Sequence, residues 1–141
     1  MQDLPPPPVI TQEVRIVDSA GQPRIILSAK TGEPSIQVVR RDGKPAATIQ
    51  LDKDDRPSVK LDNPAADGPT ATLEVDDKGA HVLFNRPGGA SSYLFLNNSG
   101  GSGVVLIDAK GARRASVVMT ADGQVTVGGV DPAKAPASPR P

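Results

Sequence analysis

Apolar and polar residues alternate in short runs along most of this chain. Ile36 and Val38 flank Gln37, and Val14 and Ile16 repeat the arrangement around an arginine. A period of two with one apolar side is typical of a half-buried strand in an antiparallel sheet. Such runs recur between residues 12 and 127. Their spacing predicts about eleven strands of roughly five to six residues each.

A turn signal separates each run from the next. In Asp18-Ser-Ala-Gly21, the first residue can hydrogen-bond its own backbone, and the fourth adopts positive φ freely. The spacing recurs at residues 29–32, 40–43, 52–55, 65–68, 76–79, 85–88, 97–100, 108–111 and 120–123. Asp55 stands where Gly is expected, and Asp is among the few residues that tolerate the left-handed conformation. Type I turns followed by a left-handed residue join antiparallel strands in hairpins.

Prolines follow several of these turns by one or two residues, namely Pro23, Pro34, Pro45, Pro57 and Pro69. Because proline has no N–H to give to a ladder of hydrogen bonds, it belongs at the first residue of a strand or at a bulge. Proline also opposes helix in its neighbourhood. The prolines therefore predict where strands begin.

Together these patterns predict an all-β fold, a repetitive antiparallel meander of about eleven short strands. The alternative is a parallel β-solenoid with a coil of about 22 residues, because Val14, Ile36 and Val59 begin equivalent strands. We prefer the meander because its turns are hairpin turns. A meander with one apolar face must curl into a barrel, fold into a sandwich or pack against copies of itself.

The strands after residue 81 are apolar on both sides, as in the runs 82–84, 93–96, 104–107 and 117–119. Strands of this kind are covered on both faces. We therefore expect a dense core or an interface at Phe84, Tyr93, Phe95, Val105 and Ile107. With no Trp, one Tyr and two Phe, the chain has few large side chains for a core of its own. We expect a homo-oligomer, with a trimer favoured.

Composition divides the chain into three parts. Its 141 residues fit one domain, and 14 Gly and 15 Pro are concentrated in turns and at the ends. Residues 1–11 contain Pro5-Pro6-Pro7-Pro8, which predicts a stiff, extended spacer. Residues 12–127 form the β-repeat domain. Residues 128–141 are rich in Pro and Ala without apolar periodicity, so we expect a disordered tail.

Charge and cysteine content narrow the classes of partner. Sixteen basic and 16 acidic residues give a net charge of zero, so we expect no nucleic-acid partner. The absence of Cys excludes disulfides and thiolate metal sites. No apolar run approaches the roughly 18 residues of a membrane span, so we expect no direct membrane insertion. The compartment stays open; if Gln2 marks the start of a processed chain, an exported or cell-envelope protein is favoured.

Few residues are candidates for chemistry. Asp52, Asp54 and Asp55 bring oxygen ligands together and are weak calcium candidates, because no complete calcium-loop motif follows them. A solvated turn is the preferred interpretation. His81 is the only His, and charge-relay catalysis would need it beside a nucleophile and an acid such as Asp108. We expect no catalytic residue, no cofactor and no enzyme activity.

The unit Asp-x-x-Gly-x-x-Arg followed by Ala or Ile occurs at residues 18–25 and 108–115. It resembles the units of uncharacterised bacterial tandem β-repeat proteins and, more distantly, the β-stalks of phage tail fibres. The resemblance covers roughly residues 12–127 and implies a structural or adhesive role. We therefore expect a non-catalytic stalk, fibre subunit or spacer that works through self-association. The alternative is a carbohydrate- or protein-binding module that presents its turns or the Tyr93 region.

Overall fold

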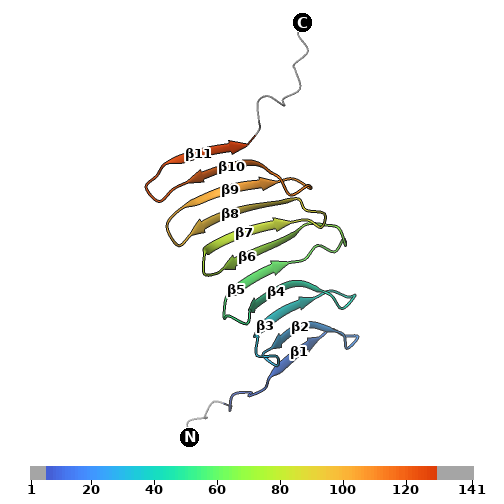
Figure 1. Ribbon diagram of the computed structural model, residues 1–141. Coiled ribbons are helices and arrows are strands. Elements are labelled where there is room, and N and C mark those ends of the chain that lie inside the picture. The colour runs from blue at the N-terminus through green and yellow to red at the C-terminus, as the bar shows by residue number, and fades with distance from the viewer. Residues whose placement is uncertain (1–5, 130–141) are drawn as a thin grey trace.

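In the computed structural model, which describes residues 6–129, the chain forms one sheet of eleven strands (Figure 1). The strands are β1 (Glu13–Val17), β2 (Pro23–Ser28), β3 (Ser35–Val39), β4 (Pro45–Leu51), β5 (Pro57–Leu61), β6 (Thr70–Val75), β7 (Gly79–Asn85), β8 (Ser91–Asn97), β9 (Ser102–Ile107), β10 (Arg113–Met119) and β11 (Val125–Gly129). Residues 1–5 of the expected spacer (1–11) and residues 130–141 of the expected tail (128–141) lie outside the described residues.

The strands lie in sequence order, and each pairs antiparallel with the next. The predicted all-β meander is therefore confirmed. The alternative β-solenoid is wrong, because parallel neighbours need crossovers of a dozen or more residues and these turns are too short for that. Strands β1 and β11 lie at opposite ends of the sheet (Figure 1), so the sheet is open rather than closed into a barrel.

Local hydrogen bonds hold the turns as predicted. The amide of Gly21 donates to the carbonyl of Asp18 at 2.9 Å, and the Asp18 carboxylate accepts the amides of Ala20 and Gln22 at 3.0 Å. The equivalent amide-to-carbonyl bond closes the turns at 29–32, 40–43, 52–55, 65–68, 97–100, 108–111 and 120–123. Asp55 has a φ of 58°, the left-handed conformation expected for it.

Two turns differ from the prediction. The turn expected at 85–88 lies one residue later, with Gly89 donating to the carbonyl of Arg86 at 3.2 Å. This position places Pro87 second in the turn, where its fixed φ is favoured. The turn at 76–79 is tighter than expected, because the amide of Asp76 bonds the carbonyl of Gly79 across a two-residue loop.

The prolines lie where the sequence predicts. Pro23, Pro45 and Pro57 are the first residues of β2, β4 and β5, and Pro34 and Pro69 directly precede β3 and β6. Pro23 and Pro45 also lie at register shifts, where β2 and β4 each have one extra residue relative to the preceding strand. At none of these positions does the sheet need the backbone N–H that proline lacks.

The pairing places one apolar side chain after another on the same side of the sheet. We define the apolar face by eighteen large apolar side chains that share this side in strands β1–β11. They are Val14, Ile16, Leu27, Ile36, Val38, Ile49, Leu61, Leu73, Val75, Phe84, Leu94, Leu96, Val104, Leu106, Val117, Met119, Val125 and Val127. Direct partners across the ladder, such as Ile36 and Ile49, continue the face from strand to strand.

The other side, which we call the mixed face, is polar in the first strands and apolar in the later ones. Gln37, Thr48 and Lys60 follow one another across β3, β4 and β5. Thr48 is only 7% exposed between these longer neighbours. Further along, Tyr93 on β8 and Val105 on β9 are partners in the same face.

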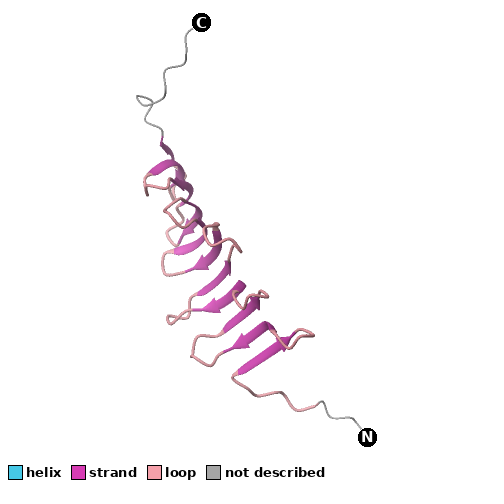
Figure 2. Cartoon of the chain, turned by 90° about the vertical axis from the view of Figure 1, so that its right-hand side faces the viewer, coloured by secondary structure: helices cyan, strands magenta, loops and turns pink. Residues whose placement is uncertain are grey.

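No second layer covers the sheet within the described part of the chain, as the edge-on view in Figure 2 makes plain. The buried apolar side chains of the described residues are Val39 and Val105. Within residues 6–129 there is no helix long and apolar enough to cross a membrane. Nothing within residues 6–129 therefore covers the apolar face.

The glycine positions generate a first prediction. Gly79 has a φ of 150°, and a Cβ added there would lie 2.6 Å from the Cα of Asn97 and closer still to the carbonyl of Leu96. Gly111 also has positive φ, at 76°, but opens into free space. We expect Gly79→Ala to destabilise the fold by more than about 3 kcal/mol and Gly111→Ala by about 1 kcal/mol. Urea unfolding followed by circular dichroism measures both; equal losses would contradict the close approach at Gly79.

Candidate functional site

The apolar face is the largest unusual surface of the molecule. Its eighteen side chains are each between 37% and 76% exposed. With roughly 80 Å² exposed for each of them, the face offers on the order of 1,400 Å² of apolar surface. The largest apolar patch of a typical monomer is about 300–600 Å². A face of this size is characteristic of an interaction surface.

The five residues predicted as interface do not share one surface. Phe84 lies on the apolar face and is 52% exposed. Tyr93, Phe95, Val105 and Ile107 lie on the mixed face, and Val105 is fully buried within its own chain. The period of two puts Phe84 and Tyr93 on opposite sides, because Tyr93 pairs with Leu83 rather than with Phe84.

An aromatic groove lies on the mixed face beside the loop between β6 and β7. The rings of Tyr93 and Phe95 are 5.8 Å apart and tilted by 42°. Phe95 pairs with Gly103, whose missing side chain leaves room for the ring. A cavity of about 390 Å³ includes both rings together with His81. The hydroxyl of Tyr93 accepts a hydrogen bond from Arg113 at 3.2 Å.

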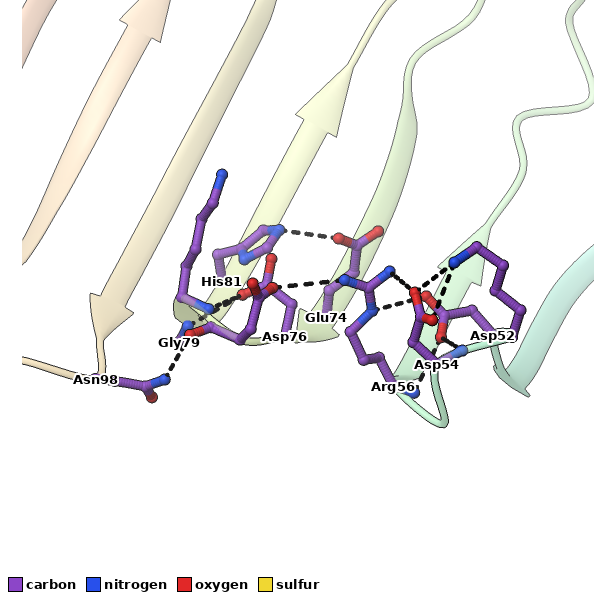
Figure 3. A network of polar contacts seen from close by, with 11 residues as sticks. Asp52, Asp54, Arg56, Glu74, Asp76, Gly79, His81 and Asn98 are labelled. Carbon is purple, nitrogen blue, oxygen red and sulfur yellow. Dashed lines mark hydrogen bonds and ion pairs between the residues drawn. The ribbon is translucent and has the colours of Figure 1, made fainter.

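The acidic cluster at residues 52–55 is engaged within the chain. Asp52 accepts the amides of Asp54 and Arg56 at 2.8 and 3.1 Å, and its second oxygen binds the Arg56 guanidinium at 2.9 Å. Asp54 contacts the same guanidinium and the ammonium of Lys53 (Figure 3). Among residues 6–129, no group of three or more His, Asp or Glu side chains is arranged to hold a metal ion. The calcium candidates thus lie in a turn stabilised by its own amides and cations.

The only histidine serves a cross-strand pair. His81 on β7 contacts the carboxylate of Glu74 on β6 at 3.0 Å (Figure 3). His81 lies near the sheet edge that holds Asp76, whereas Asp108 lies in a turn at the opposite edge. His81 and Asp108 are therefore too far apart for the charge relay considered from the sequence.

Successive turns on the same edge are also tied to one another. On one edge, Arg56 binds Asp77 at 3.5 Å, and the side chain of Asn98 donates to the carbonyl of Asp77 at 2.9 Å (Figure 3). On the other edge, Arg86 donates to the carbonyl of Asp67 at 3.2 Å. Exposed contacts of this kind are individually weak, but they fix the spacing between turns.

The two rows of turns carry opposite charge. We call the edge formed by the turns before β2, β4, β6, β8 and β10 the basic edge, and the opposite edge the acidic edge. Within residues 6–129, each charged side chain except Arg15 lies nearer to one edge. The basic edge holds nine cations (Arg24, Arg40, Arg41, Lys44, Lys60, Arg86, Lys110, Arg113, Arg114) and five anions (Asp18, Asp42, Asp62, Asp67, Asp108). The acidic edge holds nine anions (Glu13, Glu33, Asp52, Asp54, Asp55, Glu74, Asp76, Asp77, Asp122) and four cations (Lys30, Lys53, Arg56, Lys78).

This segregation was missed in the sequence, because a net charge of zero conceals it. The signal was available: in a meander, alternate turns lie on the same edge, so the charges of every second turn can be added. The alternation of apolar and polar residues in the sequence predicted the apolar face. It did not predict that the face is exposed, since exposure depends on what the chain packs against.

The sequence matches no protein-family model, no curated protein and no solved structure.

The Asp52 turn generates a prediction on pH. Hydrogen bonds from the Arg56 amide, and then from the Asp54 amide and the Arg56 guanidinium, lower the pKa of the Asp52 carboxyl below its ordinary 3.8. Because the folded pKa is lowered, the stabilisation is complete above the ordinary value and is lost as the pH falls through the folded pKa. We expect Asp52→Ala to lower the melting temperature at pH 7, with the difference from wild type shrinking between pH 4 and pH 2.

The measurement is a melting series at one protein concentration, because association also shifts the melting temperature. Asp52→Asn is the matched control, since it keeps an oxygen for the two amides but does not titrate. A difference between Asp52→Ala and wild type that stays constant from pH 7 to pH 2 would show that the carboxylate charge contributes nothing.

Proposed function

We propose that this chain is a non-catalytic structural β-repeat protein that acts as a stalk, fibre subunit or spacer through self-association. The observation that carries the proposal is the apolar face, which runs across all eleven strands and is open in one chain. A sheet with one apolar side is stable only when that side is covered. Further copies of the same chain offer a covering surface of the same length and apolar character.

The shape of the sheet supports the role of a spacer. Eleven strands about 4.8 Å apart span about 48 Å, and β1 and β11 lie at opposite ends (Figure 1). The chain therefore enters the sheet at one end and leaves it at the other. The Pro-rich ends of the sequence act as linkers on either side. The recurrent turn unit, which resembles bacterial tandem repeats, agrees with this role.

A second candidate is a binding module for carbohydrate, favoured by the aromatic groove. Tyr93 and Phe95 present tilted rings beside a cavity of about 390 Å³. The groove lies mainly on the mixed face, so covering the apolar face leaves these rings accessible. A glycan array separates the two candidates: binding that is lost in Tyr93→Ala favours the module, and no binding favours the spacer.

The adjacent residues Ile49 and Gln50 provide a matched test of self-association. Both are exposed in β4, but Ile49 lies on the apolar face and Gln50 on the mixed face. We expect Ile49→Asp to reduce the assembly to monomers or weaken it at least tenfold, because it places a charge inside an apolar interface. Gln50→Asp introduces the same residue with low strand propensity, and we expect it to leave the mass of the assembly unchanged.

Light scattering after size exclusion gives the mass of each variant. The melting temperature at two protein concentrations is the second measurement, because only an associating protein melts at a higher temperature when more concentrated. A monomeric wild type whose melting is independent of concentration would refute the proposal.

A further inference from the structure

The charges on the two edges indicate how the copies are arranged. We propose that three copies pack in parallel around a common axis along the long dimension of the sheet, with the basic edge of each copy beside the acidic edge of the next. This inference rests on the proposed self-association and adds its direction, its contacts and its number of copies. It uses charged turns that the assembly role alone does not require.

Two ways of joining apolar faces bring different edges together. When the rotation axis follows the long dimension of the sheet, all copies run in the same direction and unlike edges meet. When the axis follows the strands, the copies run in opposite directions and like edges meet. The second arrangement would place the acidic edge, with nine anions and four cations, against another acidic edge. Like charges in contact are costly, so the charges favour the parallel arrangement.

The charges also match at two levels of the sheet. Arg41 and Lys44, in the turn between β3 and β4, form no ion pair among the described residues. At that level the acidic edge of a parallel neighbour presents Glu33 from the turn before β3 and Asp55 from the turn after β4. Both of these carboxylates also form no ion pair within residues 6–129.

The same match occurs near the other end of the sheet. Lys110 lies in the turn between β9 and β10, and it has no carboxylate within ion-pair distance in the described part of its own chain. A parallel neighbour brings Asp122, from the turn between β10 and β11, to an adjacent level. In the antiparallel arrangement, Lys110 would instead meet the basic edge near β2.

The width of the strands favours three copies. Strands of 5 to 7 residues are about 17–24 Å long, and this length is the width of the sheet. A triangular prism with sides of this width has its axis about 5–7 Å from each sheet, which is close to half of the 10 Å spacing between packed sheets. Three such sheets therefore fill the space between them without a hollow. Each basic edge then meets one acidic edge at each corner, which is the head-to-tail contact of a closed ring.

Cross-linking tests this arrangement cleanly, because the chain has no Cys. Ala109 lies in a turn of the basic edge and Ala121 in the nearest turn of the acidic edge, and both are exposed. The double variant Ala109→Cys/Ala121→Cys is treated with a short bis-maleimide at a concentration where light scattering shows assembly. The strand width keeps the two sites apart within one chain, so we expect most of the protein to migrate as a covalent trimer on a denaturing gel.

The matched control is Ala121→Cys/Thr31→Cys, which places both thiols on the acidic edge at opposite ends of the sheet. This pair comes together only in an antiparallel assembly, so we expect no cross-link from it. Cross-linking of the control, or a covalent dimer from the first variant, would overturn the inference while the proposed self-association stands. A protein that is monomeric before the reagent is added would refute the proposed function itself.

Discussion

The sheet's need for cover on its apolar side determines the rest of this structure. Residues 6–129 pair every strand with its neighbours but leave the apolar face exposed, with on the order of 1,400 Å² of apolar surface in water. On the mixed face, side chains of the same sheet cover part of the surface without a second layer. There, the ring of Phe95 lies beside Gly103, and Thr48 is only 7% exposed between Gln37 and Lys60. The apolar face carries no long polar side chain among its eighteen residues, and apart from Phe84 and Met119 it consists of Val, Ile and Leu, which fit another sheet.

The sheet itself is held by local interactions. All hairpins except β2–β3 and β5–β6 close through bonds between residues three or four apart. In the Asp52 and Asp108 turns, the carboxylate also accepts two amides and an arginine. These bonds set the register of a hairpin without help from distant residues. Arg56 and Asn98 then connect turns that are two strands apart. Local bonds therefore define the register of the sheet, and its stability then depends on cover for the apolar face.

Local chemistry explains which features the sequence predicted. Strand starts at Pro23 and Pro57, and the left-handed Asp55, follow from single residues and their backbone preferences, so pattern alone found them. The turn at Arg86 was placed one residue early, because Asn85 and Gly88 also fit the motif and Pro87 decides between the two. The division of Phe84 and Tyr93 between two faces depends on the register of β7 and β8. Pattern does not give that register until the turn joining the two strands is placed correctly.

The two end strands of the sheet, β1 and β11, disfavour end-to-end pairing of copies and so favour side-by-side association. The outer backbone of β1 and β11 has no partner strand among the described residues, and open strand edges invite end-to-end pairing. At β1, Glu13 and Arg15 form an ion pair on a strand of only five residues, which places charge where another strand would add. At β11, the strand ends in Gly128 and Gly129, which pack no side chain against a further strand. A short charged edge and a glycine edge both weaken growth along the axis. The apolar face and the two charged edges then remain the strongest surfaces for contact between copies, and both direct association sideways.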